Sequence, residues 1–296
     1  MSEFLKWDVE GTREYETGVD HGILFKKKDD GSYENGSVWN GLTSVDESPS
    51  GAEANDIYAD NMKYLSLTSA EDFGGSINAY SYPDEFAECN GEKVVSGIKL
   101  GQQTRKPFGF YYRTIKGNDV LYDEYGHIHH FVYNAKCTPS DSSYSTVSDS
   151  PEAIEMSWEY TTTPVKLVSK DANGKDLKAT AIVKIDDTDA SIATALGKFK
   201  LNNLLALVYG SDSADTAGYI PTADTTKSQE KTYYEITATK SGDDIVYSFS
   251  EVSGSFVEGT TYFEKAAADT SGNYPSILPT PDQIITLFAV EVEDPS

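Results

Sequence analysis

Short runs that mix large apolar residues with polar ones constrain this chain most. The clearest are PFGFYYRTI (107–115), HIHHFVYNA (127–135) and AIEMSWEY (153–160). Side chains two apart on an extended strand share a face, so runs of this kind form strands with at least one buried face. Aromatic residues make up 12% of the chain, with 20 tyrosines, and such residues pack well on pleated sheets. We therefore predict a mainly β protein.

The run at 153–160 predicts a strand with two different faces. Ile154, Met156, Trp158 and Tyr160 alternate with polar residues, so they are expected on the buried face. The opposite face is expected to be wet, because antiparallel sheets often expose one side to water. That wet face carries Glu155, Ser157 and Glu159.

Further elements are expected along the rest of the chain. A hairpin is predicted from the apolar run 22–25, the Asp30-Gly31 turn and the run through Val38 and Trp39. Other strands are predicted at 62–67, 76–82 and 180–187.

The best helical segment is 187–210, with its helix near 190–209. Asp187 or Asp189 is expected to cap it and Gly210 to end it. Its predicted buried stripe consists of Ile192, Leu196, Leu204, Leu205 and Val208. Gly197 and the Asn202-Asn203 pair could break the helix in two.

The stretch 41–60, GLTSVDESPSGAEANDIYAD, has little periodicity and is rich in Ser, Asp, Glu and Gly. It predicts a long loop, and long loops in compact proteins are usually functional or disordered. Its polar positions of interest are Ser44, Asp46, Glu47, Ser50, Glu53 and Asp56.

The last third of the chain changes character. Thr232-Tyr233-Tyr234-Glu235 is echoed by Thr261-Tyr262-Phe263-Glu264, about one hairpin later. We predict a main β domain over 1–228, a small β insertion over 229–270 and a C-terminal segment over 271–296 that returns to the main domain. Pro281 and Asp282 suit the first turn of a short helix in that last segment.

The charge balance excludes one class of function. With 24 basic and 48 acidic residues the net charge is −24, so a protein that neutralises nucleic-acid phosphates is not expected. This charge can simply keep the chain in solution, or it can serve a surface that must repel a polyanion. The N-terminus lacks the pattern of a secretion signal, no apolar run is long enough to span a membrane, and the two cysteines are expected to be reduced.

The residues that could carry catalysis or metal binding have simpler interpretations. His127 and His129 would share a strand face without a third ligand nearby, so no metal is expected. Neither a Gly-x-Ser-x-Gly elbow nor a phosphate-binding Gly-x-x-x-x-Gly-Lys is present. Asp84 and Glu88 qualify as a glycosidase pair by residue type only.

The alternative for these acids is structural. Pro83 followed by Asp84 and Glu85 is typical of a helix N-terminus, with Ser81 as a cap. We expect no enzymatic activity, no catalytic residue and no cofactor.

Four blocks of the sequence resemble the major tail proteins, or tail tube proteins, of long-tailed bacteriophages. They are WNGLTSVDESPSGAEANDIYADNMKYLSLTSAEDFGGSINAYSYPDEFAEC (39–89), GIKLGQQTRKPFGFYYRTIKGND (97–119), SDSPEAIEMSWEYTTTPV (148–165) and LPTPDQIITLFA (278–289). The resemblance covers most of residues 13–210 and the C-terminus. The chain departs from the shorter family pattern at about 229–270.

The resemblance implies a β-sandwich or barrel-like tail tube fold with two packed sheets and a flanking helix. Six copies would close into a ring, and rings would stack into the hollow tube through which DNA is ejected into the host. The protein would be made in the bacterial host cytoplasm and reside in the virion tail, without a membrane. Its partners would be further copies of itself, the tape measure, tail terminator and distal tail proteins, and genomic DNA that passes without specific binding.

The resemblance also gives roles to the polar residues above. The 41–60 loop would reach neighbouring subunits or rings, and Glu155, Ser157 and Glu159 would face the lumen, where carboxylates let DNA slide. The 229–270 insertion could lie on the tube exterior. An alternative of another class is a carbohydrate-binding or adhesin-like β-sandwich, which the tyrosines and Asp-rich loops would also suit.

Overall fold

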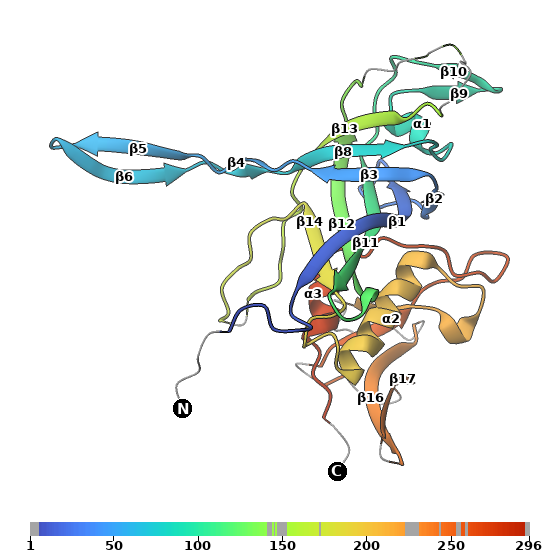
Figure 1. Cartoon of the computed structure of the whole chain (residues 1–296). Coiled ribbons are helices and arrows are strands. Elements are labelled where there is room, and N and C mark those ends of the chain that lie inside the picture. Colours follow the sequence, from blue (N-terminus) through green and yellow to red (C-terminus); the bar gives the residue numbers. More distant parts are fainter. Residues whose placement is uncertain are drawn as a thin grey trace.

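The computed structural model describes residues 6–140, 144, 146, 153–171, 173–222, 231–242, 244–252, 256–257 and 260–293. Its largest element is an antiparallel sheet of eight strands (Figure 1). Those strands are β1 (Glu14–Lys26), β2 (Ser37–Trp39), β3 (Leu42–Glu47), β8 (Gly74–Ala79), β11 (Phe108–Asn118), β12 (Tyr122–Cys137), β13 (Met156–Thr162) and β14 (Ile182–Asp186). They run in the order β2-β1-β11-β12-β13-β8-β3, and β14 also pairs with β12. The mainly β fold class is confirmed.

The central strands of this sheet are buried on both faces. On β11, Tyr111 packs into one hydrophobic core, while Phe110 and Tyr112 pack into a second. On β12, Phe131 and Val132 divide between the two cores in the same way. A strand covered on both faces needs apolar residues at consecutive positions, which accounts for the near-continuous apolar runs in the sequence.

One core lies between strands of the large sheet and α1, and aromatic rings make up much of it. Trp39 lies 4.4 Å from Phe86 and 5.6 Å from Trp158, measured between ring centroids. Tilted and edge-to-face packing of this kind adds about 0.5–1.5 kcal/mol per pair beyond burial. Phe86 belongs to α1 (Phe86–Cys89), which closes this core.

The predicted start of that helix is wrong. Pro83 was expected at the first helical position with Ser81 as its cap, but α1 begins at Phe86. The hydroxyl of Ser81 donates instead to the carbonyl of Asn40, 2.7 Å away, because the chain here is still tied to the loop before β3. Residues 83–85 form a turn that leads into the helix.

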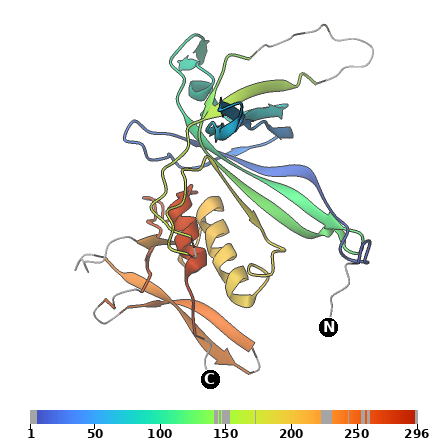
Figure 2. The same ribbon diagram turned by 90° about the vertical axis from the view of Figure 1, so that its left-hand side faces the viewer.

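The other core holds two helices between two sheets. Figure 2 shows α2 (Ala195–Tyr209) and α3 (Pro281–Ala289) between the large sheet and a second, four-stranded sheet. The second sheet runs in the order β15 (Tyr219–Thr222), β18 (Tyr262–Lys265), β16 (Tyr233–Ser241) and β17 (Asp244–Glu251). A short 3₁₀ helix, η1 (Ala214–Thr216), precedes β15.

The end of α2 before Gly210 and the start of α3 at Pro281 agree with the sequence prediction, whereas the start of α2 does not. α2 starts later than expected, and its predicted cap at Asp187 or Asp189 is wrong, because the hydroxyl of Thr194 caps it by accepting from the amide of Gly197 at 3.0 Å. It does not break at Asn203. The side-chain amide of Asn203 donates to the backbone carbonyl of Tyr219 at 2.9 Å, and its side-chain oxygen accepts from the backbone amide of Tyr219 at 2.7 Å. α3 starts at Pro281 as predicted, with a capping box between Thr280 and Gln283.

The second sheet begins before residue 229. β15 lies inside the 1–228 range and pairs with β18, so the sheet crosses the predicted boundary. Its Ile236 and Phe263 share a core with Leu204 of α2 and Phe131 of β12. The repeat at 232–235 and 261–264 corresponds to β16 and β18, which pair with each other. Residues 223–230 lie outside the described part of the chain.

The predicted loop at 41–60 is also wrong. The chain leaves β3, forms a long two-stranded ribbon and returns into β8 (Figure 1). We call residues 48–73 the arm, and its strands are β4 (Ser50–Gly51), β5 (Ala54–Ala59), β6 (Met62–Thr68) and β7 (Glu71–Asp72). Asp60 and Asn61 form its tip with φ of 52° and 63°, as a two-residue hairpin turn requires.

A second, shorter hairpin consists of β9 (Lys93–Val95) and β10 (Ile98–Leu100). It follows α1, at the end of the large sheet opposite the arm (Figure 1). All six residues of its strands are exposed.

Candidate assembly surfaces

The outer face of β13, β8 and β3 is polar. Two rows of facing residues cross the three strands, Ser157–Asn78–Ser44 and Glu159–Ser76–Asp46. The amide of Asn78 donates to the hydroxyl of Ser44 at 2.8 Å and to the carboxylate of Asp46 at 3.1 Å. The hydroxyl of Ser76 donates to the same carboxylate at 3.0 Å. We call this surface, with Glu155, the acidic face.

The structure places the three candidate lumen residues on this acidic face. Ser157 and Glu159 are exposed on β13, whereas Trp158 and Tyr160 between and beside them are buried, as the alternation predicts. Glu155 lies just before the strand and accepts a hydrogen bond from the hydroxyl of Thr43 on β3. The expected burial of Ile154 is wrong, because its side chain precedes the first paired residue and is 43% exposed.

The structure divides the candidate loop residues between two places. Ser44, Asp46 and Glu47 belong to β3, so two of them join the acidic face beside the candidate lumen residues. Ser50, Glu53 and Asp56 lie on the arm. The sequence predicted two separate sites, and the pairing of β3 and β13 with β8 brings parts of both onto one face.

Glu47 anchors the base of the arm. Its carboxylate accepts hydrogen bonds from the hydroxyl of Tyr112 at 2.8 Å and from the ammonium of Lys184 at 2.6 Å, and it lies 3.2 Å from Nδ1 of His130. Burial alone would raise the pKa of Glu47, but contacts with His130, Lys184 and Tyr112 outweigh it and lower the pKa to about 2. One side chain thus links β3 to β11, β12 and β14.

The arm has one apolar and one polar face. Residues directly opposite each other in a ribbon share a face, so Ile57 lies beside Leu65, and Met62 and Leu67 lie on the same side. These side chains are 38%, 36%, 64% and 55% exposed, respectively. We call them the apolar stripe.

The polar face of the arm is held by its own contacts. The carboxylate of Asp56 accepts from the hydroxyl of Ser66 at 2.7 Å and pairs with the ammonium of Lys63 at 2.7 Å. A bulge between Ile57 and Tyr58 shifts the register near the tip. The polar face is therefore satisfied within one chain, and the apolar stripe is not covered by it.

The histidines lie as expected on opposite faces of β12. His127 and His129 are on one face, with ring centroids 6.5 Å apart, and His130 is on the other, stacked on Tyr112. Burial, and then the nearby Arg113, lower the pKa of His129 to about 4. No group of three metal-ligating side chains occurs among the residues that the structure describes.

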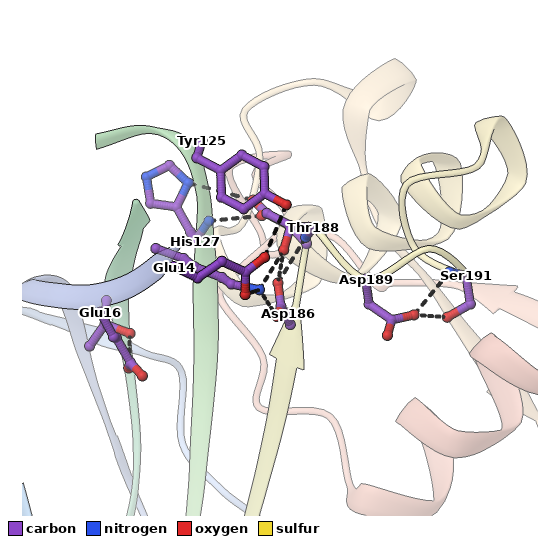
Figure 3. A network of polar contacts seen from close by, with 11 residues as sticks. Glu14, Glu16, Tyr125, His127, Asp186, Thr188, Asp189 and Ser191 are labelled. Atoms are coloured by element: carbon purple, nitrogen blue, oxygen red, sulfur yellow. Dashed lines mark hydrogen bonds and ion pairs between the residues drawn. The ribbon is translucent and has the colours of Figure 1, made fainter. Parts of the chain in front are cut away.

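A polar network ties β1, β11 and β14 to the segment before α2 (Figure 3). The ammonium of Lys116 pairs with Glu14 at 2.9 Å and Asp186 at 2.7 Å, and Tyr125 donates to Glu14 at 3.2 Å. The backbone amide of His127 donates to Asp187 at 2.8 Å. These carboxylates are paired with cations or hydrogen-bonded to amides of the same chain, so the network stabilises the fold.

The acids weighed as a glycosidase pair have separate surroundings. Glu88 on α1 pairs with the ammonium of Lys26 at 3.2 Å. Asp84 is exposed in the preceding turn, where its backbone carbonyl accepts from the amide of Ala87.

The fold and these surfaces define a mainly β protein with a projecting ribbon and an acidic sheet face. No family model matches the sequence, and no curated protein matches it significantly. In the described part of the chain, no helix has the length and apolar composition needed to cross a bilayer.

Proposed function

We propose that this protein is the major tail protein of a long-tailed bacteriophage. Copies of it assemble into hexameric rings, the rings stack into a hollow tube, and genomic DNA passes through the bore into the host. The observation that carries the proposal is the arm, which a single copy leaves without a partner.

An isolated two-stranded ribbon is at best marginally stable in water. The arm extends 13 residues from Ser48 to its tip, or about 40 Å at 3.3 Å per residue. It exposes the apolar stripe on its outer part, along β5 and β6, and exposed apolar surface of this kind marks sites of protein interaction. A second copy that covers the stripe supplies the burial that the monomer lacks.

The acidic face supports the conduit part of the proposal. Asp46, Glu155 and Glu159 lie on one sheet surface of a chain whose net charge is −24. A wall with this charge repels phosphate groups, so DNA can move along it without binding. The tape measure, tail terminator and distal tail proteins are proposed as further partners.

The test compares the intact chain with an arm deletion in which residues 50–72 are replaced by Asn-Gly. This variant keeps β3, including Glu47, and keeps Phe73, which packs against the aromatic core. We expect a folded monomer whose near-ultraviolet dichroism still reports Trp39 and Trp158 in that core. The intact chain should form rings or tubes in negative-stain electron micrographs, and the deletion should form none.

Two outcomes contradict the proposal. One is an intact chain that forms neither rings nor tubes over a range of salt and protein concentrations. The other is a deletion variant whose tubes are as long and as numerous as those of the intact chain.

A further inference from the structure

Residues 91–106 form a small projection, which we call the lobe, around the β9–β10 hairpin. Its turn residues Ser96 and Gly97 have φ of 50° and 82°, which makes the hairpin tight. Lys99 donates to the hydroxyl of Tyr82 at 2.9 Å, so its side chain reaches back to the body of the protein, while Val94 beside it is 47% exposed.

The hairpin face opposite Lys99 is apolar and exposed. The register places Val95 beside Ile98, and Leu100 beside Lys93, on that face. Val95, Ile98 and Leu100 are 48%, 63% and 48% exposed. The lobe therefore presents an apolar patch with a lysine at its border, on a scale similar to the apolar stripe of the arm.

The arm and the lobe carry opposite charge. The arm holds one cation, Lys63, and five anions, which gives 1 − 5 = −4. The lobe holds four cations and one anion, Glu92, which gives 4 − 1 = +3, in a chain of net charge −24. The cations of the lobe are Lys93, Lys99, Arg105 and Lys106. Complementary potentials of this kind steer association and disfavour like-to-like pairing.

Their positions suit a head-to-tail contact. β8 begins directly after the arm and ends shortly before α1, which the lobe follows, so the two lie at opposite ends of the β3–β8 pair (Figure 1). A contact between different patches of identical subunits leaves one free patch at each end of a pair. Such heterologous contacts close into rings or extend into stacks.

We propose that the lobe of a second copy is the acceptor of the arm, which rests on the proposed self-assembly. The apolar stripe packs on Val95, Ile98 and Leu100, with Lys93 on the same face of the lobe, and the net negative charge of the arm meets the net positive charge of the lobe. Arm-to-arm pairing would bring together two segments of charge −4, so the charges favour the lobe.

The test uses two variants of the full chain that each add one cysteine, Leu67→Cys on the arm and Ile98→Cys on the lobe. The native Cys89 and Cys137 are buried, and burial raises the pKa of each to about 12, so they do not compete. Mild oxidation of the mixed variants should give a disulfide-linked dimer that contains both cysteines. Neither variant alone should give it.

The control is Leu67→Cys mixed with Val246→Cys, because Val246 on β17 is 48% exposed and outside the lobe. The arm–lobe mixture should give on the order of tenfold more dimer, since docking raises the effective thiol concentration. Equal dimer with the control, or dimer from Leu67→Cys alone, overturns the proposal.

The outcome separates this inference from the proposed function. Tubes without an arm–lobe disulfide would leave tube formation standing and remove the lobe as the acceptor. An arm–lobe disulfide without tubes would support this contact and count against the tail tube function.

Discussion

Glu47 decides how firmly the base of the arm is held to the sheet. Its carboxylate contacts Tyr112, His130 and Lys184, which come from three different strands. The arm continues directly from this residue, so a fixed Glu47 gives the ribbon a fixed direction. A fixed direction favours the proposed docking of the arm, because disorder in a long arm would have to be lost on binding.

We predict that Glu47→Gln lowers the free energy of unfolding by about 1–3 kcal/mol at pH 7, because it weakens charge-assisted hydrogen bonds. The pKa of Glu47 is lowered from 4.5 to about 2 in the folded chain. Its stabilising effect is therefore complete above pH 4.5 and is lost as the pH falls through about 2. Urea titrations at several pH values should show the difference between variant and parent shrinking over that window.

The matched control is Glu53→Gln, since Glu53 is an exposed carboxylate on the arm itself. It should change the free energy of unfolding by no more than about 0.5 kcal/mol. A Glu47→Gln effect that is equally small, or that does not depend on pH, would show that the contacts of Glu47 contribute little to the fold.

Among the elements, α3 shows how a helix cap contributes to the stability of the core. Thr280 caps α3, and Ile284 and Leu287 of the same helix are buried between the two sheets. We predict that Thr280→Ala lowers the free energy of unfolding by about 0.5–2 kcal/mol, because it removes the cap. Thr280→Ser keeps the hydroxyl and should retain most of the stability. Equal urea midpoints for Ala, Ser and Thr at this position would rule out a role for the cap.

The same elements show what could be predicted from the sequence and what could not. Local chemistry determines α3, where Pro281 follows a capping threonine, and β13, where Trp158 and Tyr160 alternate with polar residues. The arm carries such a signal in only one of its long strands. A strand is predicted at 62–67 and is present as β6, whereas β5 lies in a stretch whose composition resembles a loop. Both strands are exposed on both faces and a bulge interrupts the two-residue period, so only the pairing of β5 with β6 shows that they form a ribbon.

The acidic face escaped prediction for another reason. Its rows join residues about 30 and 80 positions apart in the chain, through β8. Periodicity reveals which side chains of one strand share a face, but it does not reveal which strands are neighbours. The sequence therefore predicted that Glu159 lies on a wet face, but it did not predict that Ser76 and Asp46 lie beside it.

At the scale of the whole molecule, the proposed tube can be tested by reversing the charge of the acidic face. We predict that Glu155→Lys combined with Glu159→Lys still allows tubes to form, because both side chains are exposed on the acidic face. These tubes should retain a labelled oligonucleotide on sedimentation at low salt and release it as salt rises, since lysine binding to phosphate releases counterions. Tubes of the parent chain should retain none.

The matched control reverses two carboxylates of β17, with Asp244→Lys and Glu251→Lys, which change the charge by the same amount on the second sheet. If the acidic face lines the bore, lysines there surround the oligonucleotide from every subunit of a ring, whereas lysines on an outer surface contact it from one side only. The control tubes should then retain less oligonucleotide at every salt concentration. Equal retention by both variants would place the acidic face outside the bore, because only net charge would then govern binding.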